Sequence, residues 1–391
     1  MPQLLRCQPR PDRGRQRGQA FLIVVVIIMT GVIAVLYSSI GPASNRIGRE
    51  NETAAALAQA KDALIGRAAS DDNRPGSLPC PDTDNDGSAE VFAGSDCPAY
   101  IGRLPWRTLG LPDLRDHSGE RFWYALFPVF RDNSAAGMLD VDTKGGLTVY
   151  RDSTATVVTG EAVAVIFAPG PVVPGQVRDA ANANNPANYL DVTGGINNAI
   201  AAGPFIAAQA SATFNDQLLV ITTSQLMPVV EKRVAREMLA LLSAYKANSA
   251  CNCYPWASNN FDDDSVVGRH YGMVPIEDAL PESWGSGGIP SVPAWIIGSN
   301  EWGKRFYYAI ASSVTATPTP GTLTVDGTSK DLVLITPGPA GASRPSTNLS
   351  DYIEDSENRD NDNVFCRPGP SAIAPCTPTA VYARDRLYTL P

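Results

Sequence analysis

The sequence predicts an α+β protein in which an N-terminal transmembrane helix precedes two tandem modules, each a helix lying on an antiparallel sheet. Three observations predict this class: an apolar run near the N-terminus, a helix-patterned segment at the start of each half, and strand-like motifs that occur twice in the same order. The expected organisation is a basic leader over 1–18, a transmembrane and assembly helix over 19–49, a first module over 50–226 and a second over 227–391.

The apolar run extends from Ala20 to Tyr37 and is interrupted only by Thr30 and Gly31. As a helix it would rise about 27 Å, which is close to the thickness of a bilayer's hydrocarbon core. Five arginines and a single acidic residue, Asp12, precede it. A basic flank stays in the cytoplasm, so we expect the remainder of the chain to be exported.

Three interpretations of this segment compete. A secretory signal peptide has a shorter apolar region and a small-residue cleavage site, for which residues 39–44 (SIGPAS) are a weak candidate. A plain membrane anchor needs no processing. The third interpretation rests on Gly18, which lies between the arginines and the apolar run. This arrangement resembles the prepilin leader of type IV pilins and type II secretion pseudopilins.

The resemblance implies cleavage by a prepilin peptidase after Gly18, which leaves Gln19 as the mature N-terminus, with a methylated amine. The apolar helix would then anchor the protein in the inner membrane and later pack with other pilin or pseudopilin subunits. Most pilins carry a glutamate at the fifth mature position, where this chain has Ile23. Minor pilins and pseudopilins at a filament tip are similar in lacking it, so the resemblance implies a minor or tip subunit.

The composition agrees with an exported product. The chain has 31 Lys and Arg against 40 Asp and Glu, for a net charge of −9, and the basic leader makes the remainder more acidic still. An acidic domain has no electrostatic reason to bind nucleic acid. Its 33 glycines and 32 prolines indicate many loops, while 44% apolar residues suffice for a packed core.

Each module begins with a predicted helix, one from Glu50 and one from Met227. In the second, apolar residues recur at helical spacing with charged residues between them, and Pro228 is suited to a first turn. The apolar positions are Val230, Val234, Met238, Leu241, Leu242 and Tyr245. We interpret both segments as amphipathic core helices.

Three later motifs occur in both halves in the same order. Leu104–Leu126 and Glu282–Ile310 each contain a Trp, a Gly-Leu/Ile-Pro step and an Arg-Phe-aromatic-Tyr-Ala ending. Apolar strands closed by Pro-Gly-Pro follow at 163–171 and 331–339, and closing strands at 214–221 and 383–390. The order predicts an internal duplication.

Two stretches, GRLPWRTLGLPDLRD and FNDQLLVITTSQLMPVVEKRVARE, look like motifs of large prepilin-type proteins of Gram-negative bacteria. The resemblance implies a minor or tip subunit of a type IV pilus or type II secretion pseudopilus, with a single inner-membrane pass, a periplasmic ectodomain and a place at the cell surface within a filament. The alternative is an anchored or secreted envelope protein that binds or adheres without entering a filament.

Six cysteines lie beyond the apolar run, and in an oxidising compartment disulfides are the default. Cys80 with Cys97 and Cys366 with Cys376 are the first pairs that we expect, because each flanks one loop. Cys251 and Cys253 are too close for an easy mutual bridge and could instead reach Cys366 and Cys376. Six cysteines allow 15 pairings, so the connectivity stays open at this point.

The acidic motif PDTDNDGSAE predicts a Ca²⁺ loop. Asp82, Asp84 and Asp86, followed by Gly87, have the alternating oxygen spacing and glycine turn with which a loop wraps calcium. Glu90, a backbone carbonyl or water would complete the shell; a solvated turn is the alternative. Two weaker acidic clusters are NFDDDS at 260–265 and a C-terminal group made of Glu357, Asp360 and Asp362.

The sequence supplies little for an enzyme, and we expect none. It has two histidines, His117 and His270, in loop-like contexts, and no nucleophile-elbow, zinc-protease or P-loop pattern. The aromatic residues 122–124 and 306–308 are expected to pack within strands. An adhesive, carbohydrate-binding surface made of these rings is the alternative.

Overall fold

The fold is described from a computed structural model. It divides the chain into two compact units, Met1–Ala55 and Ala56–Pro391. The described residues are 47–133, 136–259, 266–275, 284, 291–296, 302–339, 348–353, 355–360, 362–367, 376 and 385–390. The predicted leader with Gly18 and Gln19, the apolar run over 20–37 and the acidic cluster at 260–265 lie outside them.

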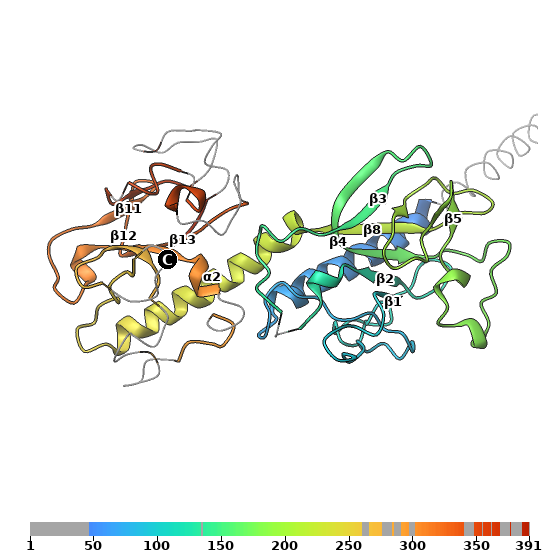
Figure 1. Cartoon of the computed structure of the whole chain (residues 1–391), viewed down its shortest axis with the longest axis horizontal. Helices are drawn as coiled ribbons and strands as arrows, with labels where there is room; N and C mark the ends of the chain where they lie inside the picture. The colour runs from blue at the N-terminus through green and yellow to red at the C-terminus, as the bar shows by residue number, and fades with distance from the viewer. Residues whose placement is uncertain are drawn as a thin grey trace, which may run out of the picture. The chain divides into compact units, whose positions relative to one another are not determined.

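The first half contains a six-stranded sheet (Figure 1) with the order β1-β2-β4-β3-β7, in which β8 also pairs with β4. Its strands are β1 (Ile101–Arg103), β2 (Trp123–Leu126), β3 (Leu147–Tyr150), β4 (Val157–Ala168), β7 (Phe205–Ile206) and β8 (Gln217–Thr222). Strands β5 (Val192–Thr193) and β6 (Ile196–Asn197) form a separate two-stranded sheet. Short 3-10 helices lie between the strands: η1 (Pro128–Phe130), η2 (Ala180–Asn182) and η3 (Pro186–Asn188).

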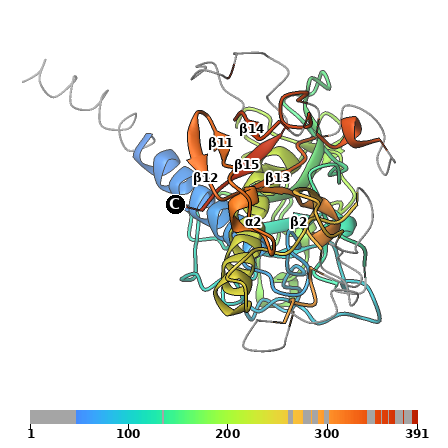
Figure 2. The same cartoon turned by 90° about the vertical axis from the view of Figure 1, so that its left-hand side faces the viewer.

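The second half contains a four-stranded sheet, β9-β10-β13-β15, and a three-stranded sheet, β12-β11-β14. Figure 2 shows the strands of the smaller sheet close to β13 and β15. The strands are β9 (Tyr271–Met273), β10 (Tyr307–Ile310), β11 (Leu323–Val325), β12 (Thr328–Lys330), β13 (Leu332–Thr336), β14 (Val364–Phe365) and β15 (Arg386–Tyr388). The 3-10 helices here are η5 (Trp302–Arg305), η6 (Ser312–Val314) and η7 (Leu349–Asp351).

The two halves pair their strands in the same register. Trp123 of β2 lies opposite Phe167 of β4, and Tyr307 of β10, the matching residue of the second motif, lies opposite Ile335 of β13. The closing strands follow the same rule, since β8 and β15 pair with β4 and β13 at matching positions. A one-residue slip would turn every side chain to the opposite face. The shared register therefore shows that the sequence duplication is also a duplication of backbone pairing.

Two glycines hold the same tight contact in both halves. A Cβ on Gly102 of β1 would lie 2.5 Å from the carbonyl oxygen of Asp82. A Cβ on Gly272 of β9 would overlap the carbonyl oxygen of Ser258. Asp82 forms an isolated antiparallel bridge with Arg103, and Ser258 forms one with Met273. In each half, the backbone of a loop therefore passes close to the edge strand beside the glycine. Only glycine leaves room for that crossing.

Buried polar groups repeat as well. Asn198 bonds the backbone N–H and C=O of Ile206, and Asn358 bonds the same groups of Cys366, eight residues on in each case. These amides hold the parallel strands β7 and β14 against the loops that precede them. Tyr124 and Tyr308 complete the set, because their hydroxyls donate to the carbonyls of Pro79 and Pro255, respectively.

Two helices supply the apolar faces that cover the sheets. The first is described over 47–69, and its buried residues from Leu57 to Ala68 recur every three or four positions. The second, α2 (Thr223–Asn248), buries a stripe in the main core. It consists of Leu226, Val230, Val234, Met238 and Leu242.

Helix α2 begins four residues before the predicted start at Met227. Thr222 and Gln225 form a capping box there, in which the Gln225 side chain accepts a hydrogen bond from the Thr222 N–H at 3.2 Å. The predicted first-turn position of Pro228 is therefore wrong, and this proline lies inside the helix. Its missing N–H removes one intrahelical bond, which packing of the apolar stripe offsets.

The predicted fold class is wrong in two respects. Its modules were expected to have antiparallel sheets, but β7 pairs in parallel with β3 and β14 pairs in parallel with β11. In each pair other strands separate the two partners along the sequence, which allows the chain to return in the same direction. The mixed sheets, with two α-helices among the described residues, replace the simpler plan of one helix on one sheet.

The predicted N-terminal transmembrane helix and single-pass location in the inner membrane are also corrected. Across the described ranges, no helix is long and apolar enough to cross a membrane. The segment from Ala20 to Tyr37, on which both predictions rested, falls outside those ranges.

The described residues form three disulfides. Cys80–Cys97 and Cys366–Cys376 are the two pairs expected first, with Cα atoms 5.5 and 5.6 Å apart. The remaining pair is Cys251–Cys253. The expectation that these two residues are too close for an easy mutual bridge is wrong. The turn around Asn252, which has a φ of +50°, holds their Cα atoms 5.2 Å apart, a distance that a disulfide can span.

Candidate functional site

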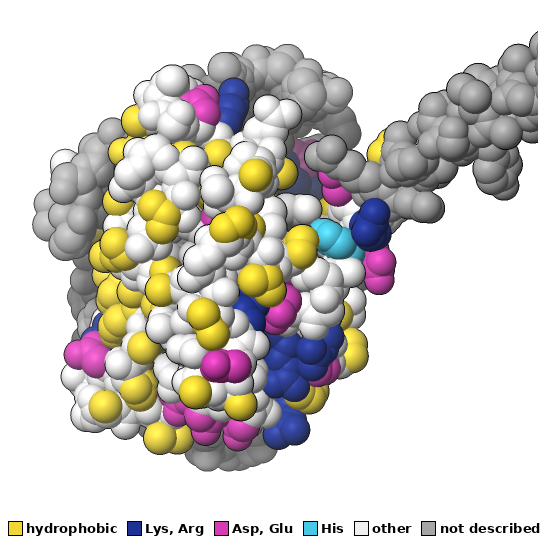
Figure 3. All heavy atoms as spheres, turned by 90° about the vertical axis from the view of Figure 1, so that its right-hand side faces the viewer, with side chains coloured by type: hydrophobic (Ala, Val, Ile, Leu, Met, Phe, Trp, Pro, Cys, Tyr) yellow, Lys and Arg dark blue, Asp and Glu magenta, His cyan; other side chains and the backbone are white. Residues whose placement is uncertain are grey.

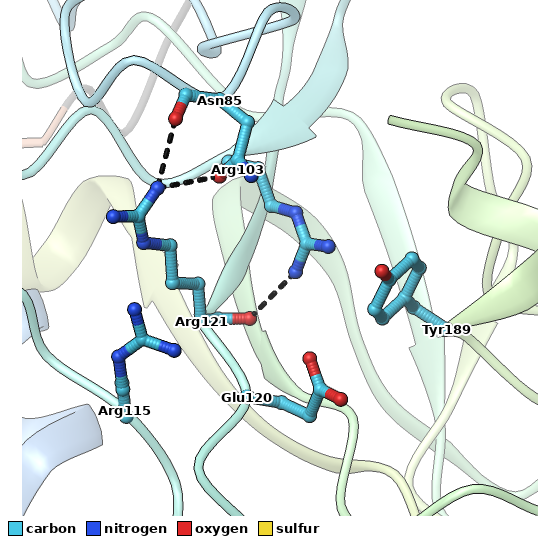
Figure 4. Close-up of a pocket in the computed structure, with 6 residues that line it drawn as sticks. All are labelled: Asn85, Arg103, Arg115, Glu120, Arg121 and Tyr189. Atoms are coloured by element: carbon cyan, nitrogen blue, oxygen red, sulfur yellow. Dashed lines mark hydrogen bonds between the residues drawn. The ribbon is translucent and has the colours of Figure 1, made fainter. Parts of the chain in front are cut away.

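A polar pocket of about 300 Å³ opens beside strands β1 and β2 (Figure 4). Its walls come from sequence positions far apart: the acidic loop, the end of β1, the turn before β2 and the segment after η3. The lining residues are Asn85, Arg103, Arg115, Glu120, Arg121 and Tyr189. Three arginines against one glutamate give these residues a net positive charge, in a chain whose overall charge is −9.

Arg103, the last residue of β1, is the most buried charge of the pocket, with 4% of its surface exposed. Its guanidinium lies 4.2 and 4.0 Å from the ring centroids of Trp123 and Tyr189, and the two rings also pack on each other at 5.4 Å between centroids. Cation–π contacts of this kind stabilise a desolvated cation by about 2 kcal/mol. Two backbone carbonyls, of Arg121 and Ala183, accept its Nη hydrogens at 3.0 and 2.9 Å.

Arg103 forms no direct ion pair in the part of the chain that the structure describes, although the charge of Glu120, in the same pocket, acts on it from farther away and favours its protonated form. Its Nε also lacks a hydrogen-bond partner. Burial lowers the pKa of Arg103 to about 10, so it remains protonated at neutral pH. A buried cation without a counter-ion is costly unless a ligand supplies the negative charge.

Arg121 and Arg115 are held in place by one carboxylate. Arg121 donates to both oxygens of Asp113, at 2.8 and 3.1 Å, and Arg115 donates to the same group at 2.6 Å. Burial raises the pKa of Asp113, but its hydrogen bonds and charge contacts with both arginines bring it below its ordinary value. Arg121 also donates to the backbone and side-chain oxygens of Asn85, both at 2.8 Å. The pocket is thereby tied to the acidic loop.

Glu120 supplies the negative charge of the pocket. Its backbone N–H donates to Asp116, and its carboxylate lies 3.4 Å from Arg178 Nη1. Figure 4 shows the Glu120 carboxylate, the Tyr189 hydroxyl and the Arg103 guanidinium around one space. The pocket therefore presents cationic donors and an anionic acceptor together.

The described residues of the second half contain no equivalent of this charge arrangement. At the register position of Arg103 it has Met273, which is buried in one apolar cluster with Tyr307 and Tyr352, the counterparts of the two rings around Arg103. Its counterpart of Arg121, Arg305, forms an ion pair with Asp140 at 2.9 Å. The same scaffold thus packs with a methionine in one half and a buried arginine in the other.

Figure 3 shows how the charged side chains are distributed over one face of the molecule. Lys and Arg side chains gather mainly in one area, bordered by Asp and Glu, and uncharged side chains cover most of the remaining described surface. A localised group of basic side chains on an acidic protein attracts anions at short range.

The predicted calcium loop has a defined geometry. One oxygen of each of Asp82, Asp84 and Asp86 lies within 4.8 Å of the others, close enough to bind one cation. Burial raises the pKa of Asp82 above its ordinary value, although the N–H groups of Gly87 and Asn85 donate to its carboxylate at 2.7 and 2.6 Å. Calcium remains a prediction.

Glu90 is oriented differently from the prediction. Its carboxylate accepts hydrogen bonds from the N–H and hydroxyl of Thr83, at 2.9 and 2.6 Å, instead of completing an oxygen shell with the three aspartates. Among the described residues, the C-terminal acidic residues Glu357, Asp360 and Asp362 form no second group of this kind.

The aromatic motifs have the packing role that the sequence predicts. All six side chains of residues 122–124 and 306–308 are buried. The alternative, a carbohydrate-binding surface made of these rings, is wrong. His117 lies half-buried beside Asp116, and His270 packs edge-on against Trp256 at 5.3 Å between ring centroids.

No protein-family model, curated protein or solved structure matches this chain. The resemblance to pilins therefore rests on its sequence motifs alone. The arginine pocket was missed at the sequence level because its residues are scattered between positions 85 and 189. One signal could have found it: in the aligned halves, an arginine in a strand of one copy corresponds to a methionine in the other.

Proposed function

We propose that the chain is a ligand-binding protein of an oxidising compartment, and that the arginine pocket of its first half binds an anion. The observation that carries the proposal is Arg103, a buried cation at the wall of the pocket that forms no direct ion pair with a carboxylate among the described residues. Three disulfides support an oxidising compartment.

A thermal-shift experiment on the full chain tests this function. Replacing sodium chloride with sodium acetate at constant ionic strength should raise the melting temperature by roughly 2 °C at saturation, because an anion that binds only the folded state stabilises it. Arg103→Met should abolish the shift and still fold, since Met273 occupies the matching position of the second half. Arg151→Met, at an exposed arginine, is the control. Equal shifts in all three proteins would refute anion binding at Arg103.

A pilin-like assembly role is the second candidate, favoured by the arginines, Gly18 and apolar run of the N-terminal sequence. In this role a prepilin peptidase would cleave after Gly18, and the repeated domain would decorate or cap a filament of other pilin subunits. Mass spectrometry of the mature N-terminus tests it. A chain that begins at Gln19, with a methylated amine, supports assembly, whereas one that begins at Met1 or near Ser44 contradicts it.

A further inference from the structure

We propose that the arginine pocket recognises an acidic saccharide, a sugar ring that carries one carboxylate and several hydroxyls. This inference rests on the proposed anion-binding function and names the ligand class for the same site. Three properties of the pocket support it: its size, its balance of charges and the geometry of its acceptors.

The size restricts the ligand to a small unit. A volume of about 300 Å³ lies at the lower end of the range for ligand pockets and suits one sugar ring better than an extended polymer. The pocket is partly open to solvent, so neighbouring sugars of a longer chain could extend outward.

The balance of charges favours one negative charge on the ligand. Arg115 and Arg121 already share the carboxylate of Asp113. Arg103 is therefore the pocket arginine that a ligand carboxylate would pair with, and a planar guanidinium matches the two oxygens of such a group. Glu120 occupies the same pocket and would repel the second charge of a phosphate dianion. The site is therefore better matched to a single carboxylate than to a phosphate group.

The Glu120 carboxylate, a hydrogen-bond acceptor in the pocket, favours a ligand that carries hydroxyl groups. An ionised glutamate has no proton to give, so Glu120 can only accept hydrogen bonds from a ligand. An ammonium donor would be repelled by the three arginines, which leaves neutral O–H and N–H groups. The Tyr189 hydroxyl lies toward the same space as Glu120 in Figure 4. Adjacent ring hydroxyls could bond to both groups, whereas a peptide end offers a single N–H beside its carboxylate.

Isothermal titration calorimetry of the full chain separates these ligand classes. The probes are glucuronate, glucose, acetate, N-acetylglycine and inorganic phosphate. We expect glucuronate to bind at least tenfold more tightly than any other probe, because it alone offers a carboxylate and several hydroxyls. Arg103→Met should abolish binding of both glucuronate and acetate, while Arg151→Met should leave both unchanged.

Glu120→Gln is the variant that isolates the sugar contribution. It keeps the side chain's size and removes its charge, so glucuronate should bind at least fivefold more weakly while acetate binds equally well or more tightly. Circular dichroism checks that each variant is folded.

Each outcome decides between the two claims. If glucuronate binds no better than acetate, the saccharide inference fails and the anion-binding function stands. If N-acetylglycine or phosphate binds most tightly, the ligand is a peptide end or a phosphate group, and the inference is again wrong. If no probe binds the unmodified chain, both claims fail together.

Discussion

At the scale of single residues, the chain uses buried charge in two different ways. Arg103 is a buried cation that faces a pocket, whereas the buried aspartates of both halves face each other inside the fold. Asp191 donates its backbone N–H to Asp216 at 2.7 Å, and Asp355 does the same to Asp385 at 3.1 Å. Because the aspartate pair occurs in both halves, we assign it the structural role of holding the closing strands. Arg103 has no such counterpart, since Met273 occupies the matching position, and this difference points to a functional role.

Asp216 predicts a pH dependence of stability. Burial, and then the charge of Asp191, raise the pKa of Asp216 to about 8. The folded state therefore holds this proton more tightly than the unfolded state, in which the pKa is about 3.9. The resulting stabilisation is complete below pH ~4 and is lost as the pH rises through about 8.

Asp216→Asn tests this assignment, because an amide oxygen can still accept from the Asp191 N–H and from Asn198. We expect the melting temperature of the unmodified chain to fall between pH 5 and 8.5, and the variant to show a clearly smaller fall. Asp355→Asn is a second variant, placed in the second half at the counterpart of Asp191. The pKa of Asp355 is raised to about 6, mainly by burial, so its effect should appear at lower pH. Identical pH profiles for all three proteins would contradict the account.

The acidic loop predicts a calcium effect that two variants can separate. Ca²⁺ should raise the melting temperature of the chain, and Asp84→Ala should remove that gain with little effect in chelator, since Asp84 is exposed. Asp82→Ala should destabilise the protein even in chelator by about 1–3 kcal/mol, because two backbone N–H groups lose their buried acceptor. Asp360→Ala is the control. A melting temperature unaffected by calcium would show that the loop is only a turn.

At the scale of elements, the sequence was informative wherever a motif occurred twice. The Arg-Phe-aromatic-Tyr-Ala segments became β2 and β10, and the apolar runs before Pro-Gly-Pro became most of β4 and β13. Strands β7 and β14 were not predicted, because two residues carry no alternating pattern. Buried side-chain amides, rather than local sequence, hold them in parallel pairing.

The two edge-strand glycines give a matched prediction at this scale. Gly102→Ala and Gly272→Ala should each destabilise the fold by about 2 kcal/mol or more, because the added methyl meets a backbone carbonyl that cannot move aside. Gly160→Ala in β4 is the control, since nothing lies within 4 Å of its Cβ position. Urea denaturation measures all three. If both edge variants were as stable as the control, the shared crossing would have no structural importance.

At the scale of the whole molecule, a duplicated scaffold carries one specialised site. The copies share strand register, edge glycines and buried amides, and they differ at the position of Arg103 and Met273. Several strands could be predicted because periodic and repeated motifs report local structure, but the fold class as a whole could not. The pocket could not be predicted either, because four separate segments of the first half meet there only after folding.

A crystal structure of the chain grown with glucuronate would show where an acidic saccharide binds. We expect the carboxylate of the ligand within hydrogen-bond distance of the pocket arginines, with its negative charge facing Arg103, and ring hydroxyls near Glu120 and Tyr189. Electron density for the ligand elsewhere, with the arginine pocket occupied by water alone, would contradict this expectation.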